Sequence, residues 1–176
     1  MSPSASPSRP PRSRKELVAA SGDLLYELQR FFECWSVLST RWPELERLGT
    51  VFEEGIAVAF LVHGRSLANV FFPTFSRQQD VIAEDFFPDP ADWNPSRHVS
   101  EVDLKAIRRW VGRDAAHVSY ARITRGSDRR DYGLILGIVR DAAIAFADAV
   151  PPDRVIAEFA ATTRGAAHST GAPSKT

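Results

Sequence analysis

The sequence predicts an all-α fold: an up-and-down bundle of four long helices with short additional helices and a packed loop rich in Phe and Pro. Apolar residues recur at spacings of three and four over four long stretches, which is typical of helices with one buried face. No stretch shows the alternation of apolar and polar residues that indicates a β-strand. With 176 residues, 44% of them hydrophobic, the chain is sized for one domain with a substantial core.

The first helix is expected from about residue 15 to residue 42, followed by a connector from Pro43 to Gly49. Side chains beside its main stripe widen the apolar face to the breadth of a bundle helix. The main stripe steps by three or four residues along its whole length: Leu17, Ser21, Leu24, Leu28, Phe31, Trp35, Leu38 and Trp42.

The second helix, expected at 51–72, is apolar on almost every face and is therefore predicted to lie in the middle of the bundle. Thr50 and Glu53 form a capping-box pattern at its start, and Pro73 stops it. His63 falls on its apolar stripe, where a hydrophobic residue would be expected.

The next segment, 73–97, contains four prolines and so cannot form one long helix. Six of the eighteen aromatic residues lie between Phe71 and Trp93, and we expect so apolar a segment to pack onto the bundle. A short helix from Gln78 to Phe87 is predicted within it. Long packed loops of this kind commonly carry function.

Ser100 is the predicted N-cap of a third helix that runs to about residue 123. The fourth helix ends at Pro151, because a proline cannot continue its hydrogen bonding. A short fifth helix is expected over 153–163, with Gly165 as its C-terminal stop.

The domain is expected at 15–164, between a disordered Ser/Pro/Arg tail at 1–14 and a second disordered tail at 165–176. The formal net charge of zero divides into +4 in residues 1–15, +2 in residues 164–176 and −6 in the remainder. An acidic body lacks the basic face of a duplex-DNA binder, so no extended DNA binding is expected. The basic N-terminal tail remains a candidate arm for an acidic partner.

No charge-free apolar run reaches membrane-spanning length, so we expect no association with a membrane. The N-terminus lacks a secretory signal, so we expect the protein in the cytoplasm. Cys34 is the single cysteine and cannot form an internal disulfide, which fits a reducing compartment. It lies among apolar helix residues, so we expect a buried, inert thiol.

Chemistry is predicted at the two histidines that lie within helical apolar faces. If their helices are neighbours, the imidazoles converge with nearby arginines on a small pocket, covered by carboxylates of the Phe/Pro-rich segment. Histidine carries protons near neutral pH, and arginine supplies the fixed positive charge that phosphodiester cleavage needs. The candidate catalytic residues are His117 and His63, and the candidate ligand-binding residues are Arg65, Arg122, Asp80 and Asp85.

A structural role for this cluster competes with the chemical one. A lone histidine in a bundle commonly hydrogen-bonds to a carboxylate or carbonyl, and buried Arg–Asp pairs commonly fix packing. Asp114 and His117 have the spacing of a carboxylate–histidine pair, but the repeated Glu-x-x-His motifs of a di-iron bundle are absent, so neither metal nor cofactor is expected. His98 and His168 are expected to be solvated bystanders.

Three segments together carry a resemblance: FLVHGRSLANVFF at 60–72, DVIAEDFF at 80–87 and AHVSYARI at 116–123. They resemble a largely uncharacterised family of small bacterial all-helical proteins with H-x-R, D-x-x-x-x-D-[FY] and A-H-x-[ST]-x-x-R motifs. The resemblance covers roughly residues 50–125. It implies His63, Arg65, Asp80, Asp85, His117 and Arg122 as site residues, which is nearly the set that the helical pattern selects.

The predicted architecture is also similar to the HEPN group of helical bundles, some of which are ribonucleases. The HEPN signature has an arginine four to six residues before a histidine. In this sequence Arg113 and Arg109 precede His117 with three and seven residues between, and Arg122 follows it. The similarity therefore concerns architecture.

These observations lead to two expectations of function. The first is recognition of a phosphate-containing ligand or RNA, with HEPN-like ribonuclease activity as its catalytic form; His117 would be the acid/base, His63 its partner, and Arg65 and Arg122 the anion anchors. The alternative is a non-catalytic interaction module in which the cluster is structural and the tails or a homodimer face bind the partner. The sequence leaves open whether the protein is an enzyme.

Overall fold

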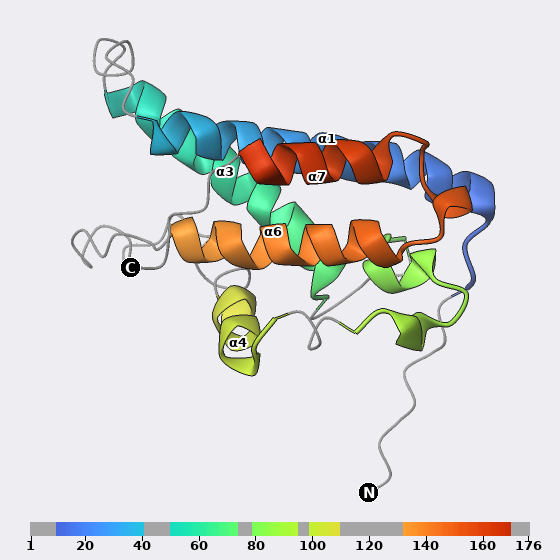
Figure 1. Cartoon of the computed structure of the whole chain (residues 1–176). Helices are drawn as coiled ribbons and strands as arrows, with labels where there is room; N and C mark the ends of the chain where they lie inside the picture. The colour runs from blue at the N-terminus through green and yellow to red at the C-terminus, as the bar shows by residue number, and fades with distance from the viewer. Residues whose placement is uncertain (1–9, 41–49, 74–78, 95–98, 110–131, 170–176) are drawn as a thin grey trace, which may run out of the picture.

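The computed structural model describes residues 10–40, 50–73, 79–94, 99–109 and 132–169 (Figure 1). All regular structure in these ranges is helical, which confirms the all-α prediction. The elements are α1 (Arg14–Ser39), α3 (Thr50–Phe71), η1 (Ala83–Phe86), η2 (Pro90–Asp92), α4 (Glu101–Arg109), α6 (Tyr132–Ala149), η5 (Pro152–Arg154) and α7 (Phe159–Ser169), where η marks a 3-10 helix.

Helix α1 begins at a capping box that the sequence prediction placed inside a disordered tail. The Ser13 backbone N–H donates to Oε2 of Glu16 at 2.8 Å, and the Glu16 N–H donates back to Oγ of Ser13 at 3.3 Å. Arg12, which also belongs to the predicted 1–14 tail, contacts the domain: its Nη2 donates to the Asp80 carbonyl at 3.2 Å. The predicted stripe is confirmed by the buried side chains of Leu17, Ser21, Leu24, Leu25, Leu28, Phe31 and Phe32.

Helix α3 has almost the predicted bounds, but it is not enclosed on every face. Its buried side chains lie on one side and include Phe60, Leu67 and Phe71. On the outer side, Val58 is 46% exposed and Val62 is 53% exposed. The prediction of a fully central helix is wrong because apolar residues on the outer face are small enough to remain in contact with water at modest cost.

The Phe/Pro-rich segment packs onto the bundle as predicted. Phe86, Phe87 and Trp93 are buried, and the Trp93 indole N–H donates to the Phe71 carbonyl at 3.2 Å. The rings of all four of these residues surround Phe146 of α6 with centroid distances between 5.3 and 5.9 Å. The predicted short helix at 78–87 is corrected to the 3-10 turn η1, because the Asp85 carboxylate binds the Ile82 N–H and starts the turn there.

Helix α4 starts where the sequence predicts. Ser100 is its cap: the Asp103 N–H donates to Oγ of Ser100 at 3.2 Å, and the hydroxyl donates to Oδ2 of Asp103 at 2.7 Å. The structure describes this helix only to Arg109, and the remainder of the predicted 100–123 helix lies outside the described residues.

The C-terminal region differs from its prediction. Residues 152–154 form only the short turn η5, and the fifth helix, α7, begins at Phe159. It continues through Gly165 to Ser169, so Gly165 is no stop and residues 165–169 do not belong to a disordered tail. The helix starts late because Ile156 has another role: its N–H donates to the buried hydroxyl of Ser21 at 2.9 Å.

Four helices close a ring around the core: α3 packs against α1 and α6, and α7 also packs against α1 and α6. Followed from blue to red in Figure 1, α1 and α7 run one way, whereas α3 and α6 run the other. Helices α3 and α6 therefore run in the same direction, and most of the predicted 100–123 helix, which comes between them in the chain, lies outside the described residues. The 11-residue helix α7 is the fourth member of this ring, and α4, the described part of the predicted 100–123 helix, contacts α6.

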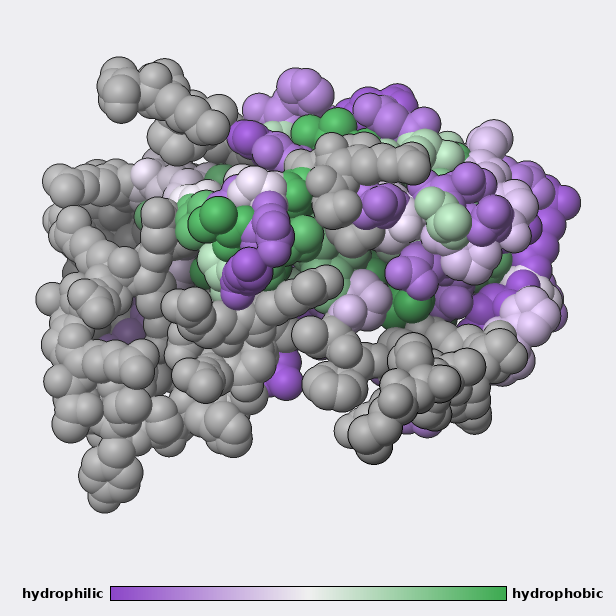
Figure 2. Space-filling model, turned by 90° about the horizontal axis from the view of Figure 1, so that it is seen from below, coloured by the Kyte–Doolittle hydropathy of each residue, from purple (hydrophilic) through white to green (hydrophobic). Residues whose placement is uncertain are grey.

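The described surface is mixed in polarity. Seen from below, hydrophilic residues cover most of it, with hydrophobic residues exposed left of centre (Figure 2). None of the helices that the structure describes has the length and apolar character needed to cross a membrane.

Candidate functional site

The predicted residue His63 pairs across the helix interface with Glu27 of α1. Its Nδ1 lies 2.8 Å from Oε2 of Glu27, so the imidazole donates from Nδ1 and keeps Nε2 as an acceptor when neutral. The side chains are 19% and 30% exposed, respectively, so solvent reaches both. A carboxylate that fixes the imidazole in this way is the arrangement that orients a general base.

Aromatic and charged side chains of α1 continue this contact along the helix. The Tyr26 ring meets the His63 ring edge-on with centroids 6.3 Å apart, and the Arg30 guanidinium lies 5.4 Å from the centre of the Tyr26 ring. Arg30 in turn pairs with Glu33 at 2.6 Å. This positive charge therefore lies beside the Tyr26 ring and is paired with Glu33; it belongs to α1 and was not among the predicted residues.

Arg65 does not share the face of α3 that carries His63. Two positions along an α-helix correspond to about 200° of rotation, so the two side chains leave the helix on opposite flanks. His63 faces α1, where it binds Glu27. The H-x-R pattern therefore does not by itself assemble a histidine–arginine site on one face of this helix.

Asp80 and Asp85 lie near the C-terminal end of α3, in and just before the turn η1. Oδ2 of Asp85 accepts the Ile82 N–H at 3.0 Å, and the Asp80 carbonyl accepts the Arg12 guanidinium. Each residue thus has a local structural contact. Their part of the chain nevertheless reaches the cavity described below through the neighbouring Val81 and Phe86.

The remaining predicted residues, His117 and Arg122, lie outside the described residues, as do His98 and Asp114. His168 lies in α7 and not in a tail; it is exposed, and its Nδ1 is 2.6 Å from the Arg164 carbonyl. Of the six candidate site residues, the structure therefore places four, at three separate positions.

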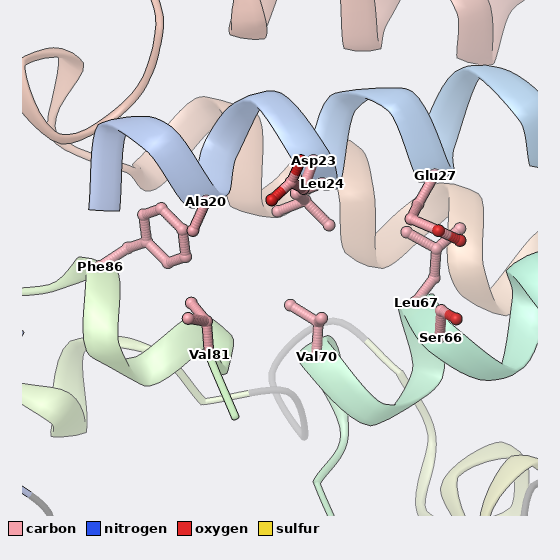
Figure 3. Close-up of a pocket in the computed structure, with 9 residues that line it drawn as sticks. All are labelled: Ala20, Asp23, Leu24, Glu27, Ser66, Leu67, Val70, Val81 and Phe86. Atoms are coloured by element: carbon pink, nitrogen blue, oxygen red, sulfur yellow. The ribbon is translucent and has the colours of Figure 1, made fainter. Parts of the chain in front are cut away.

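A cavity of about 180 Å³ opens between α1, α3 and η1 (Figure 3). Apolar side chains form most of its wall, and the polar groups at its edge are the carboxylates of Asp23 and Glu27 and the hydroxyl of Ser66. Asp23 and Glu27 are one turn apart on α1, so both project from the same face. The described lining residues are Ala20, Asp23, Leu24, Glu27, Ser66, Leu67, Val70, Val81 and Phe86.

Glu27 and Asp23 were not among the site residues predicted from the sequence. The sequence does show that these two acids are at positions i and i+4 beside the apolar stripe of α1, and therefore on one face of the helix. The partner of Glu27 is 36 residues away, however, and helical periodicity does not show which side chain of another helix will face it.

Cys34 is half-buried in α1. Burial, with Glu33 adding a negative charge nearby, raises the pKa of this thiol above its ordinary value. The thiol is therefore protonated at neutral pH, in agreement with the expected inert cysteine.

Among the residues that the structure describes, no three His, Cys, Asp or Glu side chains group as ligands for a metal ion. Comparisons of the chain with models of protein families, with curated proteins and with solved structures find no match in any of the three.

Proposed function

We propose that the protein is a non-catalytic interaction module, in which the predicted His/Arg/Asp cluster stabilises the fold. The observation that carries this proposal is the separate structural role of two described members of the cluster: His63 joins α3 to α1 through Glu27, and Asp85 starts η1. Groups that serve one reaction need to meet within about 3 Å of the reacting atoms. Local roles at separate positions fit a scaffold better than a catalytic centre.

The partner that we propose is a second copy of the chain, bound through the outer face of α3. Val58 and Val62 lie one turn apart on this face and are about half-exposed. A twofold homodimer would bring the same two side chains of each copy together, which buries apolar surface that is otherwise in water.

Sedimentation velocity over a concentration series tests this proposal. The chain is expected to shift from monomer to dimer with rising concentration, and Val58→Glu or Val62→Glu to raise the dissociation constant by about tenfold or more, since each buries an unpaired charge at the interface. Val102→Glu in α4 is the matched control, because Val102 is 75% exposed elsewhere. A chain that stays monomeric, or equal dissociation by the control, contradicts the α3 interface.

A second candidate function, recognition of a phosphate-containing ligand or RNA with HEPN-like ribonuclease activity, is favoured by one observation. Glu27 holds His63 at Nδ1 and leaves Nε2 without a hydrogen-bond partner among the described residues. In this function His63 assists His117 as acid/base. Arg65 and Arg122 bind the anion, with Asp80 and Asp85 at the edge of the pocket.

NMR titration of the imidazoles with inorganic phosphate and with a short RNA distinguishes the two functions. A phosphate or RNA site predicts that His63 and His117 resonances shift together with the added anion, and that His117→Ala abolishes any RNA cleavage whereas His168→Ala leaves it unchanged. An interaction module predicts no response of His63 to either anion.

A further inference from the structure

The cavity between α1, α3 and η1 combines apolar walls with negative charge at its edge (Figure 3). Leu24, Val70 and Phe86 supply apolar surface, and the carboxylates of Asp23 and Glu27 project from consecutive turns of α1. Like charges at i and i+4 destabilise a helix, and a cation placed between them relieves that repulsion. The apolar wall therefore suits an apolar part of a ligand, and the negatively charged edge suits a cationic group of the same ligand.

We propose that this cavity binds a small organic amine, with its ammonium group between Asp23 and Glu27 and its apolar body against Val70, Val81 and Phe86. An inorganic cation would leave the apolar wall without a partner. An anion would meet two carboxylates, which excludes the phosphate ligand of the second candidate function from this cavity. The cavity is distinct from the α3 interface because it opens between α1, α3 and η1, although its lining residue Ser66 lies one turn after Val62 on α3.

The size of the cavity limits the ligand. An engineered cavity of roughly 150 Å³ holds one benzene molecule, so about 180 Å³ accommodates a single ring or a short alkyl chain with an amino group. Phenethylamine is a suitable probe for these dimensions. Ser66, on the opposite helix, also lines the cavity, and its hydroxyl is a further acceptor for an N–H group.

The affinity of the full chain for phenethylamine, measured by NMR titration, is compared with that for 2-phenylethanol, which has the same shape without the charge. We expect saturable binding of the amine, shifts in the methyl resonances of Val70 and Val81, and about 10- to 100-fold weaker binding of the alcohol, because a hydrogen bond to a charged group is lost. Equal affinities, or no binding of the amine, would overturn the proposal.

Two variants test the location. Asp23→Asn is expected to weaken amine binding about tenfold or more and to leave the alcohol unaffected, whereas Glu158→Gln, at an exposed acid elsewhere, leaves both unchanged. Val70→Trp fills the cavity and abolishes binding of both probes without removing a charge. Thermal unfolding confirms that each variant is folded. Full amine binding by a folded Asp23→Asn or Val70→Trp chain places the ligand elsewhere and contradicts the site.

Discussion

Glu27 takes part in two features of the structure: its carboxylate accepts the Nδ1–H of His63, and its side chain lines the cavity together with Asp23. This double position links the one predicted histidine in the described core to a site that the sequence pattern did not select. The Glu27 carboxylate is only partly exposed, at 30%, and His63 supplies it with a hydrogen-bond donor. Its second oxygen leaves capacity for a further donor, because an ionised carboxylate has about four acceptor positions.

Cys34 provides a prediction at the residue scale. Because its pKa is raised by burial and by Glu33, the thiolate fraction is small at neutral pH. Alkylation by iodoacetamide at pH 7.5 is expected to be slower than in the chain unfolded by guanidinium, and to accelerate as the pH rises toward and above 9.0, the ordinary value. Glu33→Gln should increase the rate in the folded protein. Equal rates in the folded and unfolded chains would contradict the raised pKa.

At the scale of elements, helix α1 depends on its capping box. The Ser13 hydroxyl and backbone lower the pKa of the Glu16 carboxyl. A carboxyl with a lowered folded-state pKa contributes stability that is fully present above 4.5, its ordinary value, and that is lost as the pH falls through the folded-state pKa.

We therefore expect Ser13→Ala to lower the free energy of unfolding by about 1 kcal/mol at pH 7 and by less at pH 3. Urea denaturation followed by circular dichroism at both pH values measures the difference. Ser39→Ala, at the exposed far end of the same helix, is the control and should change stability by less than about 0.5 kcal/mol. An equal loss of unfolding free energy at both pH values would show that the contribution of Ser13 does not depend on the ionisation of Glu16.

The Phe/Pro-rich segment depends on Trp93. Replacing Trp93 by Phe removes the indole donor from the buried Phe71 carbonyl, which should cost about 1–3 kcal/mol beyond the loss of ring volume. Trp35→Phe is the matched control, because the buried Trp35 indole N–H has no hydrogen-bond partner among the described residues. Comparable losses in the two variants, measured by chemical denaturation, would contradict a structural role for the Trp93 hydrogen bond.

At the scale of the whole molecule, Ser21 joins the first helix to the last connection. Its hydroxyl is fully buried, donates to the Val18 carbonyl at 2.7 Å and accepts the Ile156 N–H at 2.9 Å. This contact spans 135 residues and fixes the chain just before α7 begins. The closed ring of α1, α3, α6 and α7 therefore depends on a polar residue within an apolar stripe.

Ser21→Ala should lower the free energy of unfolding by about 1–3 kcal/mol, because it leaves the Ile156 N–H without an acceptor. Hydrogen exchange of that amide provides a specific readout and is expected to accelerate. Ser169→Ala, at the exposed end of α7, should change neither quantity. Unchanged exchange at Ile156 in the Ser21 variant would show that another group accepts this hydrogen bond.

The sequence by itself determined the all-α class, the bounds of α3, the buried stripe of α1 and the cap of α4, because periodicity and capping depend on residues within one turn or two. Only the tertiary structure decided the direction of α3 and α6, the late start of α7 and the pairing of Glu27 with His63. Each of these depends on which faces of distant helices meet. Helical spacing fixes the direction in which a side chain leaves its own helix. It does not specify which residue of another helix that side chain will contact.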